Sequence, residues 1–354
     1  MSPITAQTSL LFVGGTDSSH KAGLDADLEA AEARGCEAIT IASAITDQDL
    51  FEVRSVEERL MWDHAAVDAI EKAASGPHPI AAMKFGLLPG VSSIVEAARL
   101  IARTLHGAKP IPAVVDPVIR SSSGYRFWNE RELVAVRDLA EHWRERTSGA
   151  FNPGIARLTS LWENAAGLDT LPSQESLRDV LDLLAQDRVA DLDFNGIAKG
   201  WIADTALASS LDAEPDLINA AWLNIGGDLV HRGVGSLVVG IEDPARPYDN
   251  VAPMATVEIA NEALATSGGA RRWWDIDGKR YSKVLDPRTG LPVDRVASAT
   301  VVAADAATAD VLATVALVLD PAEMLSLIEA EQAHCFVVLA NGSTITSSNR
   351  FTQS

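Results

Sequence analysis

Two oxygen-bearing side chains, Asp310 and Thr314, stand four positions apart in an apolar stretch near the C-terminus. The stretch Ala307 to Leu319 has the pattern of a helix, and residues four apart share one helical face. A carboxylate and a hydroxyl presented together suit a hard cation such as Mg²⁺, which keeps water ligands and takes further oxygens from a phosphate. The structural alternative is that Asp310 caps a helix or makes a buried hydrogen bond. On the cation interpretation, we expect Asp310 to lie exposed or in a cleft and to contribute little to stability.

A second candidate site is the segment DFNGIAKGWIAD, Asp193 to Asp204, which follows an apolar run and begins a helical pattern. Gly196 and Gly200 allow the backbone to approach another group closely. The N-terminus of a helix offers unpaired amides and a positive dipole end to an anion, and Lys199 adds a charge. The segment therefore predicts a phosphate-binding turn, although a plain helix start with a solvated lysine would give the same pattern.

Three further segments turn at glycines: LNIGGDLV (Leu223 to Val230), ALATSGGARRWW (Ala263 to Trp274) and YSKVLDPRTGLPV (Tyr281 to Val293). In the first of them, the paired glycines permit either a tight turn or the close approach of a ligand. A hairpin turn explains that segment equally well. Each of the three is, alone, a weak signal for function.

The motifs of the second half together resemble the FAD:protein FMN transferase (ApbE) family of flavin transferases. The motifs that carry the resemblance are, in order, TSGAFNPGIARLTSLW (Thr147 to Trp162), DFNGIAKG, NIGGDL, ATSGGARR, KVLDPRTGLPV and the ATADVLAT helix. The resemblance covers about residues 129–354. It implies a Mg²⁺-dependent enzyme that cleaves the pyrophosphate of FAD, transfers FMN to a Thr or Ser hydroxyl of an acceptor protein and releases AMP.

The resemblance also implies roles for individual residues. The metal ligands would be Asp310, Thr314 and the backbone carbonyl of Gly196. The contacts to FAD would be Ala150, Phe151, Asn152, Asp193, Lys199 and Val284. The catalytic residues would be Asp310 and Lys283. Displacement at phosphorus needs charge neutralisation and alignment, and a metal on the pyrophosphate supplies both, even in so acidic a protein.

This sequence departs from the flavin transferase pattern in three places. Lys283 stands where the family commonly has His, and a lysine near its reference pKa of about 10.4 is a cation that could steady the AMP leaving group rather than act as a base. Asn152 stands where the motif usually has Asp, which removes a charge. About a hundred residues that normally precede these motifs are not recognisable. A non-catalytic protein that binds FAD or another nucleotide is therefore the alternative.

The first half is similar to the N-terminal half of the hydroxymethylpyrimidine (phosphate) kinases of thiamin synthesis, which have the ribokinase-like fold. The segments that carry this similarity are GGTDSSHKAGLDADLEA, GCEAITIASAITDQ, MKFGLLPG and VVDPVIRSSSGYRF. His20 and Lys21 replace a Gly-Gly pair of that family, and Asp25 replaces a glutamine. No later Gly-rich anion hole with a catalytic Asp follows Gly124, so a kinase remnant is a further alternative rather than the favoured function.

The rhythm of apolar residues predicts an α/β parallel sheet over residues 1–128 and an α+β domain over residues 129–354. The two resemblances imply that the first is a partial ribokinase-like sheet and the second a flavin-transferase-like domain. The expected strands of the first half are Leu10 to Gly14, Ala38 to Ala44, Ile80 to Phe85 and Pro112 to Val118. Its expected helices are Leu24 to Arg34, Val56 to Ala74 and Ser92 to Leu105. Two incomplete domains that meet within one helix suggest a natural fusion or a chimera.

In the second half, helices are expected at Asn129 to Thr147 and Ser173 to Ala185, with Ser173 as a helix cap. Strands are expected at Trp222 to Ile225, Ser236 to Ile241, Ala255 to Ile259, Trp273 to Ile276 and Lys279 to Leu285. Asp277-Gly278 and Asn341-Gly342 predict hairpin turns. A strand and then a helix are expected within Thr300 to Leu319.

The composition excludes several classes of protein. The chain has 354 residues with 29 basic and 49 acidic side chains, a net charge of −20 that disfavours nucleic acid or an anionic membrane as partner. Asp305 and Asp310 interrupt the longest apolar stretch, so no membrane span is expected. The N-terminus lacks the basic region of a secretory signal, which favours the cytoplasm.

Two smaller expectations concern cysteines and assembly. Cys36 and Cys335 are too few for a disulfide scaffold or a zinc site and are expected to be small buried side chains. An incomplete sheet leaves an open edge, so a homo-oligomer is possible.

Overall fold

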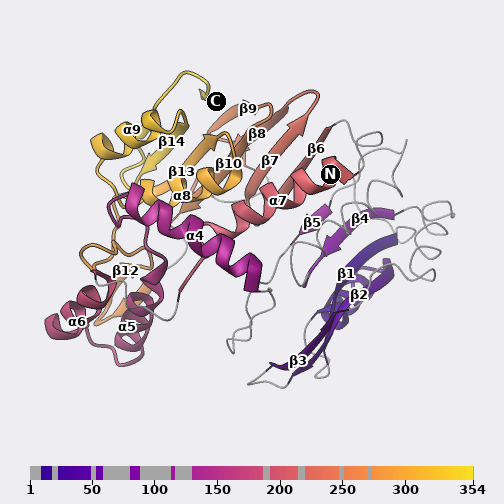
Figure 1. Cartoon of the computed structure of the whole chain (residues 1–354), viewed down its shortest axis with the longest axis horizontal. Helices are drawn as coiled ribbons and strands as arrows, with labels where there is room; N and C mark the ends of the chain where they lie inside the picture. Colours follow the sequence, from indigo (N-terminus) through magenta and orange to yellow (C-terminus); the bar gives the residue numbers. More distant parts are fainter. Residues whose placement is uncertain are drawn as a thin grey trace. The chain divides into compact units, whose positions relative to one another are not determined.

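The computed structural model divides the chain into two compact units. Unit 1 comprises Met1–Leu133 and Thr205–Gly226, and unit 2 comprises Val134–Asp204 and Gly227–Ser354. The residues that the structure describes are 9–17, 23–48, 53–58, 80–87, 113–115, 130–185, 192–213, 220–246, 251–268 and 273–353. Each unit is described by itself below (Figure 1).

Unit 1 contains a mostly parallel sheet, as the sequence predicts. Its strands are β1 (Ser9–Asp17), β2 (Glu37–Gln48), β3 (Val53–Glu58), β4 (Ile80–Phe85), β5 (Ala113–Val115) and β6 (Ala220–Ile225). Strand β1 lies between β2 and β4 and is parallel to both, and β5 is parallel to β4 and β6 (Figure 1). Helix α1 (Leu24–Glu32) packs Leu24 and Ala31 against Phe12 of β1. The α/β prediction for this half is confirmed.

One expected helix of unit 1 is wrong at its start. The residues from Val53 to Glu58 form β3, antiparallel to β2, whereas the sequence predicts a helix from Val56. Strand β2 runs on to Gln48, beyond the expected end at Ala44, and this extension gives β3 its pairing partner. Pairing with a neighbouring strand outweighs local helical periodicity here. The rest of this expected helix, residues 59–74, and the one at 92–105 lie outside the described residues.

Unit 2 is built around an antiparallel sheet. Its strands, in spatial order, are β15 (Thr344–Thr346), β14 (His334–Leu339), β13 (Val296–Ala303), β10 (Ala263–Gly268) and β7 (Asp228–Gly233). A smaller sheet of β16 (Thr352–Gln353), β9 (Ala255–Ile259) and β8 (Leu237–Ile241) packs on it through an apolar core. Val302 and Phe336 belong to that core. Strands β7, β10 and β16 are additions to the elements that the sequence predicts, whereas β14 and β15 are the arms of the hairpin expected at Asn341-Gly342.

The helices of unit 2 place the candidate residues. They are α4 (Glu130–Arg146), the 3-10 turn η1 (Pro153–Ile155), α5 (Ala156–Gly167), α6 (Gln174–Ala185), the start of α7 (Ala198–Ala213), α8 (Ala306–Ala316) and α9 (Pro321–Ala330). Helix α8 follows β13 directly and packs against β10 and β13. The expected strand and helix within Thr300 to Leu319 are therefore confirmed. Ser173 caps α6, since its Oγ accepts a 3.0 Å hydrogen bond from the Ser176 amide.

A two-stranded hairpin completes unit 2. Strands β11 (Trp273–Ile276) and β12 (Lys279–Ser282) are joined by Asp277 and Gly278, which both have positive φ, at 49° and 68°. Two left-handed residues in a two-residue loop match the twist of paired strands. The predicted turn at Asn341-Gly342 likewise joins β14 to β15. Trp274 of β11 stacks on Trp162 of α5, with 5.8 Å between ring centroids.

The predictions about a membrane span and about the burial of the two cysteines can be compared with the described part of the chain. There, no helix combines the length and apolarity needed to cross a bilayer. Cys335 is buried in β14, as expected. Cys36 is only half-buried, because it lies in the short connection between α1 and β2 rather than within an element.

Candidate functional site

The first turns of α7 and α8 lie in direct contact. A Cβ atom on Gly200 of α7 would lie 2.6 Å from the Ala307 nitrogen, and closer still to the Ala306 carbonyl. One helical turn after Gly200, the Asp204 carboxylate accepts hydrogen bonds from the amides of Ala306, at 2.8 and 2.9 Å, and Ala307, at 3.0 Å. Gly200 and Asp204 thus fix the N-terminus of α8 on α7, and this contact sets the positions of all later residues of α8.

Two carboxylates share this helix N-terminus. Asp305 is the N-cap residue and accepts a 2.8 Å hydrogen bond from the Thr308 amide. Burial raises the pKa of Asp204 from 3.8 to about 6, and the Asp305 charge adds to the rise, while the two backbone amides and Arg232 oppose it. The helix N-terminus favours negative charge. The pKa of Asp204 is nevertheless raised, because burial and the Asp305 charge outweigh that effect.

Three charged side chains meet beside that junction. The Lys199 ammonium, in the first turn of α7, donates a hydrogen bond to Oδ2 of Asp228 and lies 3.7 Å from Oδ1 of Asp310. The Asp228 and Asp310 side chains are 1% and 3% exposed. Each keeps one buried oxygen that has no hydrogen-bond partner among the described residues, Oδ1 of Asp228 and Oδ2 of Asp310. Two acids and one cation leave this buried cluster one positive charge short.

The electrostatics of the cluster reflect that deficit. Burial raises the pKa of Asp310 well above its ordinary value, and the negative charge of Asp228 raises it further against the pull of Lys199. Burial likewise raises the pKa of Asp228, which Lys199 lowers. Burial lowers the pKa of Lys199, but Asp310 and Asp228 together outweigh it, so this pKa is raised. An added cation would relieve the repulsion between the two acids.

The expectation that Asp310 lies exposed or in a cleft is wrong. Its carboxylate is buried in a helix whose neighbouring residues are nearly all buried too. The reason is that α8 lies against β10, β13 and α7, so the face that carries Asp310 is covered rather than open. Replacing Asp310 by Ala would therefore also change the charge balance around Lys199.

Thr314 and Gly196 meet one turn further along α8. A Cβ atom on Gly196 would lie 3.2 Å from Oγ1 of Thr314 and 3.2 Å from Cε2 of Phe151, so only a glycine fits without a shift. Oγ of Ser267 lies 3.2 Å from Oγ1 of Thr314. The α8 face that carries Asp310 and Thr314 therefore faces the turn that carries Gly196 and Lys199.

The residues predicted to bind a metal are suited to a hard cation. The donor set is oxygen throughout, and Oδ2 of Asp310 is buried with no hydrogen-bond partner in the part of the chain that the structure describes. The described residues include no group of three or more His, Cys, Asp and Glu side chains arranged for a metal. A cation here would rely on one carboxylate, one hydroxyl, a backbone carbonyl and oxygens from water or a ligand. Such a sparse set matches Mg²⁺, which usually keeps waters and shares phosphate oxygens.

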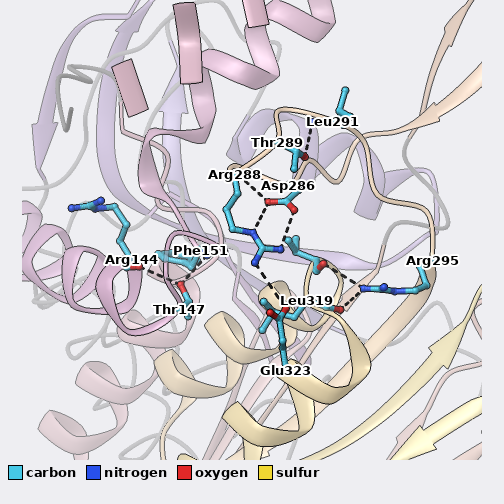
Figure 2. A network of polar contacts seen from close by, with 11 residues as sticks. Arg144, Thr147, Phe151, Asp286, Arg288, Thr289, Leu291, Arg295, Leu319 and Glu323 are labelled. Carbon is cyan, nitrogen blue, oxygen red and sulfur yellow. Dashed lines mark hydrogen bonds and ion pairs between the residues drawn. The ribbon is translucent and has the colours of Figure 1, made fainter. Parts of the chain in front are cut away.

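The predicted FAD contacts Ala150, Phe151 and Asn152 lie next to the Gly196 turn. Oγ1 of Thr147, at the end of α4, accepts a 3.0 Å hydrogen bond from the Phe151 amide (Figure 2). Oδ1 of Asn152 accepts a 2.8 Å hydrogen bond from the Gly154 amide and so caps η1, a role that the Asp expected there could also fill. The structure joins this segment to Asp193 through the backbone.

That backbone link is short and ordered. The Asp193 amide donates a 2.6 Å hydrogen bond to the Pro153 carbonyl. Oδ1 of Asp193 accepts a 2.8 Å hydrogen bond from the Asn195 amide, which stabilises the turn that leads to Gly196. Eight of the ten predicted site residues thus form one continuous set of contacts: Ala150, Phe151, Asn152, Asp193, Gly196, Lys199, Asp310 and Thr314.

The other two, Lys283 and Val284, are joined to the β11–β12 hairpin instead. Lys283 is exposed, and its Nζ lies 5.3 Å from the centroid of the Trp274 ring. The Val284 carbonyl accepts a 2.8 Å hydrogen bond from the Val293 amide. The chain that follows them approaches the Ala150 region at Arg288, whose Cγ lies 3.9 Å from a Cβ placed on Gly149.

Arg288 belongs to a rigid turn. Its backbone amide and Nε donate to Oδ1 of Asp286, at 2.9 and 3.0 Å, and Nη2 donates to Oδ2 at 3.0 Å (Figure 2). The pKa of Arg288 is raised, mainly by its hydrogen bonds to Asp286. Nearby, Arg295 donates to the Leu319 carbonyl and pairs with Asp320 at 2.6 Å, and so caps the end of α8.

Sequence reasoning missed three residues of this site. Asp228 was part of the NIGGDL motif, but only the glycines of that motif were assigned a function, as a turn or a ligand approach. Ser267, of ATSGGARR, contacts Thr314, and Asp204, of DFNGIAKGWIAD, holds the N-terminus of α8. Each acidic or hydroxyl residue inside a glycine motif was a signal, but its partner lies far away in the sequence.

Comparison with protein families gives two matches. The ApbE family matches residues 121–339, more than half of the chain. Phosphomethylpyrimidine kinase matches residues 17–143. The two matches overlap over residues 121–143, which contain most of α4. Both resemblances drawn from the motifs are confirmed.

Curated relatives share part of their length with this chain. The FAD:protein FMN transferase of Treponema pallidum is 29% identical over 224 residues, which are 54% of this chain and 60% of that protein. The enzyme of the same name from Vibrio cholerae is 30% identical over 213 residues, 54% of this chain and 62% of that protein. One from Klebsiella pneumoniae is 31% identical over 242 residues, 61% and 68% respectively. The chain thus spans about 60% of the first two relatives.

Solved structures agree on the fold of the second half. The ApbE protein of Thermotoga maritima has a TM-score of 0.52 at 29% identity, and the match covers 62% of this chain and 76% of that one. The flavin transferase ApbE from Vibrio cholerae has a TM-score of 0.50 at 25% identity, with 65% of this chain and 79% of that one covered.

Proposed function

Because this chain belongs to the ApbE family, we propose that it transfers FMN from FAD to a Thr or Ser hydroxyl of an acceptor protein, with Mg²⁺ and with release of AMP. In this reaction the acceptor oxygen forms a bond to the FMN phosphorus, and the bond from that phosphorus to the bridging oxygen breaks. The hydroxyl proton is lost to solvent or to the departing AMP. The observation that carries the proposal is that the Gly196–Lys199 turn faces Asp310 and Thr314.

The residues that would hold the cation are Asp310, Thr314 and the carbonyl of Gly196. When bound, Mg²⁺ would supply positive charge to the pyrophosphate oxygens of FAD and so weaken the bond to the leaving group. The orphaned Oδ2 of Asp310 and the charge deficit of the cluster support this assignment.

The remaining residues would bind and orient FAD. Lys199 is one-third exposed, so its ammonium can reach a phosphate while it stays bonded to Asp228. The Ile197 and Ala198 amides at the start of α7 already donate to the Phe194 carbonyl, at 3.0 and 2.8 Å, and the Gly200 amide bonds Asp310, so Lys199 is the group of this turn that we assign to the anion. The buried segment of Ala150 and Phe151 forms an apolar wall beside the Gly196 turn. In this proposal, these groups exclude water and fix the position of the phosphate. Such positioning supplies most of the rate enhancement in phosphoryl transfer.

Lys283 would act differently from these residues. Its ammonium is exposed and lies over the Trp274 ring. Among the described residues, no base accepts a hydrogen bond from it. A lysine ammonium can stabilise the charge that develops on AMP, but it cannot accept the proton of the acceptor hydroxyl. We therefore assign Lys283 to the leaving group.

The test uses the whole chain with FAD and Mg²⁺. Water can replace the acceptor, so FMN and AMP released from FAD are separated by chromatography, and FMN transfer is then measured as a mass adduct on an acceptor protein with a flavinylation site. The proposal expects both products to need Mg²⁺ and to be lost on chelation or in Asp310→Asn. The absence of both FAD cleavage and a mass adduct, under varied metal and acceptor, would contradict the proposal.

A second candidate function is FAD binding without turnover. Two observations favour it: Lys283 replaces the usual histidine, and the chain spans about 60% of the relatives from Treponema pallidum and Vibrio cholerae. This candidate expects FAD to stay with the protein through gel filtration in Mg²⁺ without release of AMP. Saturable binding of hydroxymethylpyrimidine would instead point to unit 1 as the functional part.

A further inference from the structure

Asp228 is a buried acid that has no part in the metal site or in the FAD contacts proposed above. It is the first residue of β7, and its side chain is 1% exposed. Oδ2 accepts a hydrogen bond from Lys199, and Oδ1 is buried with no hydrogen-bond partner from any described residue. A buried carboxylate that is not fully paired lowers stability. Its presence next to the proposed cation ligands therefore calls for an explanation.

The position of the Lys199 ammonium supplies one. Two carboxylates lie within its reach, but the nearest oxygen of Asp310 is 3.7 Å away, beyond a hydrogen bond, while Asp228 is in direct contact. The lysine is bonded to one acid and held off the other. The Asp310 carboxylate also contacts the Asp228 side chain and the Gly200 amide, and its Oδ2 has no hydrogen-bond partner among the described residues.

We infer that Asp228 is a positioning residue that anchors Lys199 and so keeps Asp310 available to a divalent cation. The inference rests on the proposed function, because it takes Asp310 as a cation ligand and Lys199 as a phosphate contact. Without the anchor, attraction between opposite charges would draw the ammonium onto Asp310. The lysine would then compete with the cation for the carboxylate, and it would no longer stand beside the cation to meet a phosphate.

Two other roles for Asp228 make different predictions. As a direct cation ligand, Asp228 would contribute to cation affinity whether or not Lys199 is present. As a distant negative charge, it would also act independently of Lys199. Only an anchor acts through the lysine, so only an anchor loses its effect when the lysine is removed.

The experiment is a double-mutant cycle with Asp228→Asn, Lys199→Met and the combined variant of the full chain. Binding of Mn²⁺, which takes the same oxygen ligands as Mg²⁺, is measured without FAD by the loss of the free-ion EPR signal. FAD affinity in Mg²⁺ is measured in parallel by quenching of flavin fluorescence. Asp275→Asn, on an acid that is 68% exposed on the hairpin, is the matched control.

The anchor predicts that Asp228→Asn weakens Mn²⁺ binding by about tenfold when Lys199 is present and by less than about twofold in the Lys199→Met background. It also predicts weaker FAD binding in Asp228→Asn, with Asp275→Asn unchanged in both measurements. Equal losses in the two backgrounds would overturn the inference and indicate a direct ligand or a simple charge effect. Unchanged Mn²⁺ binding in Asp228→Asn would overturn it as well.

The experiment also distinguishes a failure to fold, or a failure of the proposed function, from a failure of the anchor. The combined variant removes both members of the Lys199–Asp228 pair and is expected to stay folded by circular dichroism even where a single variant is weakened. If Asp228→Asn does not fold, the comparison of Lys199→Met with the combined variant still decides: a large further loss of Mn²⁺ binding contradicts the anchor, and no loss supports it. No Mn²⁺ binding by the unmodified chain would defeat the proposed function itself, a result distinct from any pattern within the cycle.

Discussion

Lys199 and Lys283 are both assigned to the phosphates of FAD, yet they lie in contrasting surroundings. Lys199 is held by a buried acid, stands near a second one and has a raised pKa because of both. Lys283 is exposed and rests over the Trp274 ring. The first belongs to a region whose parts come from α7, β7 and α8, and the second to a local hairpin. The two lysines thus have different roles because their neighbours differ. Lys199 balances the charge of buried acids, whereas Lys283 can be replaced with little effect on the fold.

In the buried region, Gly200→Ala is the substitution with the largest expected loss of stability. A Cβ at this position would collide with backbone atoms of α8, which cannot move without displacing Asp310 and Thr314. We expect a loss of about 3 kcal/mol or more in the free energy of unfolding, or no folded protein. Urea denaturation measures it. Gly167→Ala, where no described atom beyond its own helix and chain neighbours lies within 4 Å of the added Cβ, is the control and should be neutral or slightly stabilising.

The contrast between the lysines is tested directly by the pair Lys199→Met and Lys283→Met. Removing Lys199 leaves two buried acids without their cation, and we expect unfolding to become easier by about 3 kcal/mol in the absence of metal. Removing Lys283 ends one exposed contact with an aromatic ring, which is worth about 0.5 kcal/mol. Equal losses in thermal or urea unfolding would show that the two surroundings do not differ as described. Mg²⁺ should restore part of the stability of Lys199→Met only.

Lys283→His sharpens the comparison at the level of activity. An imidazole is partly neutral near pH 7 and can accept the proton of the acceptor hydroxyl, which a lysine ammonium cannot do. We expect FMN transfer near neutral pH to rise by about tenfold, with a rate that falls as pH drops below the imidazole pKa. Lys283→Gln is the control of similar size and should show no such pH profile. A fall in transfer with histidine as large as that with glutamine would contradict the expectation that an imidazole at this position accepts the proton of the acceptor hydroxyl.

The smallest effect concerns pH and Asp204, the acid that fixes α8. Its pKa is raised from 3.8 to about 6 in the folded chain. The folded state therefore binds this proton more tightly than the unfolded state, so the group stabilises the fold below the unfolded pKa and loses that contribution as pH rises through about 6. Between pH 7 and pH 5, Asp204 should add about 1 kcal/mol to stability on acidification.

The matched variant for that prediction is Asp204→Asn, which has no proton to bind in this range. Its deficit relative to the unmodified chain should be about 1 kcal/mol larger at pH 5 than at pH 7, as measured by urea unfolding at both values. Asp275→Asn, an exposed acid, should show no such change. A deficit that shrinks on acidification would mean that the pKa is lowered rather than raised.

Much of the fold was predictable because its causes are local. Alternation of apolar runs indicated β1, β2 and β4, and Asp277-Gly278 indicated the hairpin because its left-handed residues are chemically marked. The start of the helix expected from Val56 failed, because the extended β2 supplies β3 with a partner that no local window contains. Strands β7 and β10 were missed for the same reason: pairing with β13 and with each other, rather than composition, makes them strands.

The features of the candidate site can also be divided into those with local causes and those that depend on distant partners. The spacing of Asp310 and Thr314, and the glycine-lysine turn, could be read from the sequence because a helix places residues four apart on one face whatever surrounds it. The burial of Asp310, the anchoring of Lys199 by Asp228 and the seat that Asp204 provides for α8 depend on partners about thirty to a hundred positions away. Those features were decided by the tertiary structure alone, because burial and charge pairing are properties of neighbours in space, and only the folded chain determines which residues become neighbours.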